Sequence, residues 1–229
     1  MRLIAFDTET TGMTRERGKP VCAEHRVIEL GCVELTDLDQ SPFFHSYLKP
    51  NRDVDPGAFA VHGLSNSFLN DKPTFDIIAE NFIAFIEGAT LIAHNAPFDI
   101  DFINQELSLI GMKPLTYYCK TIIDTLPLAR KIYPGKKNSL DALCQRLNID
   151  LSGRAYHGAL KDSYLLLMVY RKLIGGQSEL NFISDNIHSS MTIKKINSAA
   201  QELGLPKISI TDEELTAHHE FIKKYIKTY

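Results

Sequence analysis

The sequence predicts an α/β protein with a mixed sheet flanked by helices. Three runs rich in β-branched and aromatic residues come first, and from residue 75 onward short apolar runs alternate with helical patterns. Consecutive strands followed by such alternation are typical of a sheet with both antiparallel and parallel neighbours. The 229 residues are 44% hydrophobic and 23% charged, which suffices for one domain with its own core and a smaller appendage.

The first strands are predicted from residue type and length. Three are expected before residue 50: Leu3–Asp7, Val27–Leu35 and Phe43–Leu48. Pro50–Pro56 indicates a polar, turn-rich connection. Apolar residues at helical spacing then predict a helix over Phe75–Ile86, which Gly88 ends.

Strands and helices alternate in the middle of the chain. A strand at Thr90–His94 is followed by a helix that Asn95 is expected to cap, with Pro97 in its first turn and Gly111 at its end. Lys120–Asp124 indicates a further strand. Three helices complete the pattern: Thr125–Tyr133, Ser139–Leu147 and Ala159–Leu173.

Two glycines, Gly175 and Gly176, indicate the end of this domain, so residues 1–176 are expected to form one unit and residues 177–229 an appendage. Residues 178–206 are more polar and favour a linker. A capping box that begins at Thr211 then predicts a helix to about residue 227.

Bulk properties exclude some classes of protein. No basic segment followed by an apolar stretch opens the chain, and the apolar runs are too short to span a bilayer, so a cytoplasmic protein without membrane attachment is expected. The four cysteines show no zinc-like spacing, and Cys32 and Cys144 are expected in the core. A net charge of −3 disfavours binding of nucleic acid by bulk electrostatics alone. Carboxylates that hold cations would remove this objection, because bound metal inverts the local charge.

Asp7 and Glu9 form the first candidate cluster, at the end of the first strand. The two-residue repeat of a strand puts both carboxylates on one face, about 7 Å apart along the backbone. Their mutual repulsion favours a bound cation, and such hard oxygen ligands suit Mg²⁺ or Mn²⁺. The alternative is a solvated strand end without function.

Two further clusters contain an acid in the first turns of a helix. Asp99 follows the His94–Phe98 segment, where the helix dipole favours an ionised carboxylate, and His94 is expected to be structural. His157 and Asp162 are too far apart for one helical face, so the histidine is expected in the loop before the helix and the acid inside it. There His157 could act as a general base, or be an ordinary surface histidine.

In this order, the residues Asp7-x-Glu9, Asp99 and His157-x4-Asp162 resemble the signature of the DEDDh exonuclease family. The related group with tyrosine as base would need that residue at position 158, where Gly158 stands. The resemblance implies a ribonuclease H-like fold and 3′→5′ hydrolysis with two divalent metal ions, Mg or Mn. One ion would activate water and the other would stabilise the leaving oxygen.

Roles for single residues follow from the same resemblance. Asp7 would bridge both ions, Glu9 and Asp162 would complete the site of the ion that activates water, Asp99 would hold the second ion, and His157 would be the general base. Asp7, Glu9 and Asp162 should also lie beside the bound nucleotide.

Around the site, His62 in the segment Phe59–Leu64 matches the family histidine that contacts the terminal nucleotide. Gly57 departs from the pattern, because related chains carry Glu there. The loop with Arg15, Arg17 and Lys19 could meet phosphates or be solvated.

The whole chain is similar to the family of proofreading (epsilon) subunits of bacterial DNA polymerase III. The segments that carry this similarity are Asp7–Met13, Leu128–Arg130, Pro134–Gly135 and Ser139–Cys144. The similarity implies that the partners are a DNA 3′ end and the polymerase alpha subunit, and leaves open a small theta-like accessory subunit. Four basic residues are candidates for the DNA backbone or for a solvated helix end: Arg130, Lys131, Lys136 and Lys137.

The appendage offers two candidate binding segments. Gln177, Leu180 and Phe182 fit the Gln-x-x-Leu-x-Phe pattern of peptides that bind the sliding clamp, where the two apolar side chains would enter pockets. The predicted final helix has a one-sided apolar stripe that suits a groove on the polymerase or packing on its own domain.

Two other functions remain alternatives. A free-standing RNA exonuclease of the same family, of the oligoribonuclease or tRNA-trimming type, would share the five residues but generally ends near the last catalytic helix. An inactive binding module would not need the five residues intact.

Overall fold

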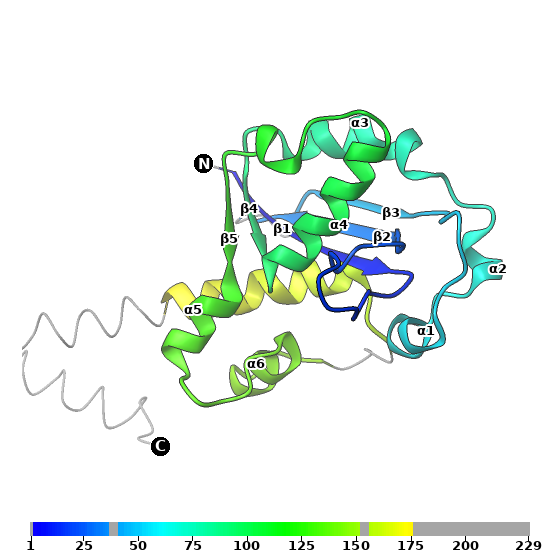
Figure 1. Cartoon of the computed structure of the whole chain (residues 1–229). Coiled ribbons are helices and arrows are strands. Elements are labelled where there is room, and N and C mark those ends of the chain that lie inside the picture. Colours follow the sequence, from blue (N-terminus) through cyan, green and yellow to red (C-terminus); the bar gives the residue numbers. More distant parts are fainter. Residues whose placement is uncertain (1, 37–40, 152–155, 176–229) are drawn as a thin grey trace, which may run out of the picture. The chain divides into compact units, whose positions relative to one another are not determined.

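The computed structural model describes residues 2–36, 41–151 and 156–175 (Figure 1). The chain divides into two units between residues 177 and 178, and only the first is described below. Its centre is a five-stranded sheet of order β3-β2-β1-β4-β5. The strands are β1 (Leu3–Thr10), β2 (Val27–Glu34), β3 (Phe43–Tyr47), β4 (Thr90–Ala93) and β5 (Thr121–Asp124).

The sheet is mixed, as predicted. β1 pairs antiparallel with β2 and parallel with β4, β2 pairs antiparallel with β3, and β4 pairs parallel with β5. The first three strands run as a meander, whereas β4 and β5 follow helical crossovers, which is why the pairing changes direction at β1.

Helices cover both faces of the sheet (Figure 1). The helices labelled in Figure 1 are α1 (Pro56–His62), α2 (Asn66–Leu69), α3 (Phe75–Ile86), α4 (Ala96–Leu109), α5 (Thr125–Ile132) and α6 (Leu140–Arg146). A short 3-10 helix, η1 (Leu115–Tyr117), follows α4. One more helix covers residues 159–175; it is the last one within the described ranges and is named the last helix. Within the described ranges, none of these helices is long and apolar enough to cross a membrane.

Alternation along β1 divides the core into two layers. Ile4 and Phe6 pack with α3 and α4 on one face, whereas Ala5 packs with Leu166 and Tyr170 of the last helix on the other. Odd-numbered residues of β1 therefore face the last helix and even-numbered residues face α4.

Within the described residues, the predicted elements are confirmed with small shifts, and three corrections concern the site. β1 continues to Thr10 instead of ending at Asp7, so Glu9 is held within the strand. Asn95 does not cap α4 with its side chain; it adopts a left-handed conformation (φ 69°), and its N–H donates to Asp124 Oδ1 at 3.0 Å. Pro50–Pro56 leads directly into the short helices α1 and α2, which were not predicted.

All four cysteines are free and buried, and Cys32 and Cys144 lie in the core as expected.

Candidate active site

Asp7 and Glu9 lie on the face of β1 that packs against the last helix. Both are partly buried, and the ladder between β1 and β2 pairs Glu9 with Glu29. Directly opposite residues of an antiparallel pair project from the same face, so Glu29 stands beside Glu9. Glu29 is only 3% exposed and accepts a hydrogen bond from His45 Nε2 at 2.8 Å.

Asp99 reaches the same region from the first turn of α4. It is 3% exposed, and its Oδ1 accepts hydrogen bonds from the Thr8 N–H (3.0 Å) and the Thr8 hydroxyl (2.7 Å). Burial raises the pKa of Asp99 to about 7, although the two bonds from Thr8 act to lower it. The carboxyl is therefore held in a fixed place, where burial disfavours its ionised form and a bound cation would stabilise that form.

Asp162 and His157 come from the start of the last helix. Asp162 is buried, whereas His157 lies before the helix, as predicted, with 42% of its side chain exposed. His157 Nδ1 is 3.2 Å from Asp162 Oδ2, and His157 Nε2 is 3.9 Å from Asp141 Oδ2. The imidazole thus stands between two carboxylates.

Gly31 of β2 brings the start of the last helix against the sheet. A Cβ at Gly31 would overlap the backbone of Ala159 and Leu160. Ser163 then ties the helix to the strand, because its hydroxyl donates to the Gly31 carbonyl at 3.0 Å. This close approach, which only glycine permits, sets the position of Asp162.

The acids from β1, α4 and the last helix line one cavity of about 200 Å³. It contains all five residues that the sequence singled out for chemistry, together with Asp141: Asp7, Glu9, Asp99, His157 and Asp162. Glu9, His157 and Asp162 each offer one ligand atom, and these atoms lie within 4.8 Å of one another. The structure therefore brings together side chains from β1, α4 and the last helix.

The electrostatics of this cavity suit a cation. Burial raises the pKa of Asp7 well above its usual value, and the charges of Asp99, Glu9 and Asp162 raise it further. Clustered acids of this kind repel one another unless positive charge is present. Carboxylate oxygens are also the ligands that Mg²⁺ and Mn²⁺ prefer. The donor set fits a divalent ion.

His62 lines a larger neighbouring cavity of about 690 Å³, which shares Glu9 and Phe98 with the first. His62 is 4% exposed, and its Nδ1 accepts a hydrogen bond from the Leu64 N–H at 3.0 Å. Burial lowers the pKa of His62, which keeps the ring neutral. Its Nε2 is buried and makes no hydrogen bond with any described residue, while the nearby Thr10 backbone acts to raise the pKa of the ring.

Two residues of unsettled role, Gly57 and Arg15, also line this larger cavity. Nothing lies within 4 Å of a Cβ placed on Gly57, so the structure has room for a side chain at this position. Lys19, by contrast, is engaged in ion pairs with Glu16 (2.7 Å) and Glu24 (3.8 Å).

A third cavity, of about 480 Å³, adjoins the first on its other side through His94, Asn95 and Ser139. Two of the predicted backbone-binding residues, Arg130 and Lys136, line it. His94 itself is structural, as expected. Its Nδ1 is 2.8 Å from the Thr125 hydroxyl, and its Nε2 is 2.8 Å from the Asn138 carbonyl oxygen.

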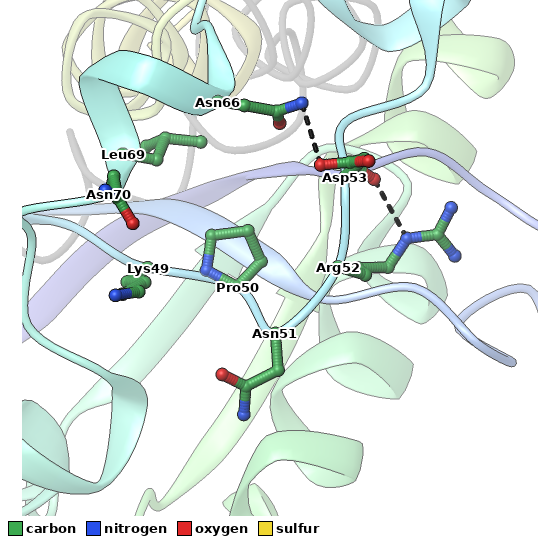
Figure 2. A pocket seen from close by; sticks show the side chains of 8 residues that line it. All are labelled: Lys49, Pro50, Asn51, Arg52, Asp53, Asn66, Leu69 and Asn70. Carbon is green, nitrogen blue, oxygen red and sulfur yellow. Dashed lines mark hydrogen bonds between the residues drawn. The ribbon is translucent and has the colours of Figure 1, made fainter.

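A separate polar cavity of about 350 Å³ lies where the chain enters α1 (Figure 2). There Asn66 donates to Asp53 Oδ1 at 3.0 Å, and Arg52 Nε donates to the Asp53 carbonyl at 3.1 Å. Arg52 also pairs with Asp55 at 2.7 Å. None of the predicted site residues within the described ranges lines it, and its hydrogen bonds support the segment that leads into α1.

The sequence did not single out Glu29 or Asp141. Glu29 had a signal, since it is a charged residue within an otherwise apolar strand. Asp141 resembles an ordinary acid in the first turn of a helix that Ser139 caps, and only the fold brings it near His157. The clamp candidates Gln177, Leu180 and Phe182, and the predicted final helix, lie outside the described residues.

Comparisons with known proteins agree with this geometry. The model of the Exonuclease family (RNase_T) matches residues 4–170. The chain is 41% identical to the DNA polymerase III subunit epsilon of Rickettsia conorii, over 100% of this chain and 98% of that one. It is 44% identical to the subunit of the same name from Escherichia coli K12, over 95% and 90% of the two chains.

Among solved structures, the nuclease domain of 3′hExo, a DEDDh family member bound to rAMP, has a TM-score of 0.63 at 20% identity and covers 76% of this chain and 92% of that chain. Exonuclease X in complex with duplex DNA has a TM-score of 0.58 at 23% identity and covers 77% and 93%. At this level of identity the likeness shows a shared fold. Together with the relatives that match nearly the whole chain, the family model shows that this chain belongs to the Exonuclease family and, within it, to the DNA polymerase III epsilon subunits.

Proposed function

We propose that this chain removes nucleotides one at a time from DNA 3′ ends as the proofreading subunit of a bacterial DNA polymerase III. The observation that carries the proposal is the convergence of Asp7, Glu9, Asp99, His157 and Asp162 on one cavity. The relatives that match nearly the whole chain, named as epsilon subunits, support DNA as the substrate and the polymerase as the partner.

Two divalent ions, Mg²⁺ or Mn²⁺, would be held by the carboxylates of the cavity. Asp7 is central, because the charges of Asp99, Glu9 and Asp162 all act on it. Glu9 and Asp162 would share one ion, and Asp99, fixed by Thr8, would hold the other. When bound, such ions supply an activated water and stabilise the leaving oxygen.

His157 is the group we assign as general base. Its partly exposed imidazole lines the cavity and lies beside the carboxylates of Asp162 and Asp141, where it can reach a water molecule at the site. Asp141 is assigned a supporting role, since it faces the ring nitrogen on the side away from Asp162.

The cavity that contains His62 would receive the terminal nucleoside. Its volume of about 690 Å³ and its mixed lining of Met13, Val61 and Phe98 with the buried His62 ring suit a base and a sugar. Arg130 and Lys136, on the opposite side of the catalytic cavity, would contact the phosphates of the preceding nucleotides. Single-stranded ends fit this path best, and a mispair lowers the cost of fraying them.

The proposed partners act through the appendage. Residues 1–176 would be the catalytic domain, and residues 177–229 would hold the clamp-binding peptide, a linker and the polymerase-binding helix. A small theta-like subunit is a further candidate partner. Work at the replication fork implies a cytoplasmic protein.

The test is a direct assay of the full chain with Mg²⁺ on DNA and RNA oligonucleotides of the same sequence. We expect release of 5′-mononucleotides from DNA 3′ ends, faster from a mispaired terminus. Asp162→Asn should lower the rate at least 100-fold, on the order of the loss of a group essential to the chemistry. Glu80→Gln, at an exposed site on α3, is the matched control and should retain full activity. A strong preference for short RNA would replace the proposal with an RNA exonuclease.

A further inference from the structure

The cavity for the terminal nucleoside and the segment that contains His157 are joined by a backbone hydrogen bond. The N–H of His157 donates to the carbonyl of Val61 in α1 at 3.1 Å. Val61 and the next residue, His62, both line the nucleoside cavity, whereas His157 lines the catalytic one. One bond therefore connects the two cavities through the main chain.

An aromatic contact reinforces this bond. Gly63 ends α1 in a left-handed conformation (φ 71°), and a Cβ placed there would lie 3.1 Å from Tyr156 Cγ and 3.2 Å from both Cδ atoms. The face of the Tyr156 ring thus lies over the Gly63 Cα. Because 59% of Tyr156 is exposed, core burial does not account for its position.

The bond and the ring contact meet at the residue we assign to the nucleotide. His62 lies between Val61 and Gly63, lines the nucleoside cavity, and has a buried Nε2 without a hydrogen bond to the described residues. A ligand that contacts His62 acts on the C-terminal turn of α1. Since the same turn contacts Tyr156 and His157, a shift of α1 is transmitted to the general base.

Glu29 of β2 also lies close to this segment. Both Glu29 carboxylate oxygens lie 3.8 Å from the position of a Cβ on Gly158, the residue after His157. The segment is therefore held between β2 and α1. Of these two neighbours, α1 is the one that lines the nucleoside cavity.

We propose that the contact of Val61–Gly63 with Tyr156–His157 positions the general base according to whether a nucleoside occupies the neighbouring cavity. The inference rests on the proposed function. Tyr156 and Gly63 are positioning residues, because they act through His157 and do not line the catalytic cavity. A well-seated terminal nucleoside fixes α1, and α1 then fixes the imidazole in a productive position. Small errors in the position of a catalytic group are costly, so such coupling affects turnover more than binding.

The first experiment compares two DNA substrates that differ only at the 3′ terminus: a normal nucleotide and an abasic analogue with the same 3′ hydroxyl. In the wild-type protein, loss of the terminal base should lower kcat about tenfold. Tyr156→Ala should lower kcat on normal DNA by a similar factor and change KM by no more than about twofold. In this variant, loss of the terminal base should lower kcat by no more than about twofold. Tyr156→Phe keeps the ring and should restore the wild-type pattern.

Tyr117→Ala is the matched control, since Tyr117 is also exposed and lies on η1, which contributes no residue to the catalytic or nucleoside cavity. It should leave both substrates unaffected. If loss of the terminal base lowers kcat by the same factor in wild type and in Tyr156→Ala, the coupling is overturned, while the exonuclease assignment stays intact.

A second readout does not depend on turnover. Binding of a deoxynucleoside 5′-monophosphate should slow hydrogen exchange of the His157 amide in the wild-type protein and have no such effect in Tyr156→Ala. Exchange that the nucleotide does not change in wild type would overturn the proposal. A wild-type protein that binds the nucleotide and slows this exchange but degrades no DNA would instead count against the proposed function.

Discussion

The backbone N–H and the hydroxyl of Thr8 both donate to the same carboxylate oxygen of Asp99, at 3.0 and 2.7 Å. Asp99 is thereby fixed to β1, the strand that contains Asp7 and Glu9. Thr8 is not an acid itself, but the position of Asp99 in the carboxylate cluster depends on it.

Replacing Thr8 with Val tests that dependence. The variant keeps the shape and the backbone bond but loses the hydroxyl. Both bonds from Thr8 lower the pKa of Asp99. Loss of the hydroxyl bond should therefore raise that pKa further and weaken metal-dependent activity about tenfold. Thr8→Ser retains a hydroxyl and should keep most of the activity. Equal rates in Thr8→Val and wild type would contradict the role.

The acid cluster predicts an unusual pH dependence of stability in the metal-free protein. The pKa of Asp99 is about 7 in the fold, above its value of about 3.9 in an unfolded chain, so the folded state binds the proton more tightly. The free energy of unfolding should therefore fall as the pH rises from about 4 to about 7, and a few kcal/mol is the order of magnitude. Urea titrations in EDTA at several pH values measure this fall, and Asp99→Asn should make it smaller.

Metal should reverse this penalty. Mg²⁺ or Mn²⁺ binding to the carboxylates stabilises only the folded state, so the Tm of the wild-type protein should rise with metal concentration at pH 7.5. Asp7→Asn removes a carboxylate whose pKa is raised by burial and by the charges of Asp99, Glu9 and Asp162. It should raise the Tm of the metal-free protein and reduce its response to metal. A wild-type Tm that is unchanged by millimolar metal would contradict a cation site in this cavity.

Gly31 and Gly57 form a matched pair for testing how the last helix is placed. A methyl at Gly31 would meet the backbone of Ala159 and Leu160, whereas at Gly57 it would meet nothing within 4 Å. Gly31→Ala should destabilise the fold by about 2 kcal/mol or more and reduce activity by displacing Asp162. Gly57→Ala, in α1, should be neutral or stabilise by about 0.5 kcal/mol. Urea unfolding of the two variants beside wild type separates these outcomes.

The clamp proposal has its own test. Leu180→Ala combined with Phe182→Ala should leave nuclease activity on oligonucleotides unchanged but weaken retention of the purified sliding clamp in a pull-down at least tenfold. Gln177→Ala should have a smaller effect in the same direction. Retention equal to wild type would remove the clamp from the set of proposed partners.

Much of the fold followed from the sequence because strong local patterns and tertiary packing agree. The mixed sheet and the helix Phe75–Ile86 are of this kind. α1 was missed because it has only seven residues, one of which is Gly57, too few for a clear helical pattern. The left-handed conformation of Asn95 was also missed, since it depends on Asp124, which is distant in sequence.

The site divides in a similar way. The order and spacing of the acids led to the five residues that share the catalytic cavity, while their individual roles stay predictions. Glu29 and Asp141 could not be assigned from spacing. A cross-strand pair places Glu29 beside Glu9, and a contact between α6 and the segment before the last helix places Asp141 beside His157. Gly31 gave no local signal either, as its function is the absence of a side chain beside a helix 128 residues later along the chain.

β1 supplies the site from both of its faces: Asp7 and Glu9 project toward the last helix, and Thr8 between them projects toward α4. The arrangement consequently depends on the alternation of side chains between the two faces of β1. Insertion or deletion of a single residue between Ile4 and Asp7 would exchange the two faces, turning the metal-binding acids toward α4 and the hydroxyl toward the last helix. A protein altered in this way would keep every catalytic side chain and every spacing downstream, yet it would have lost the site.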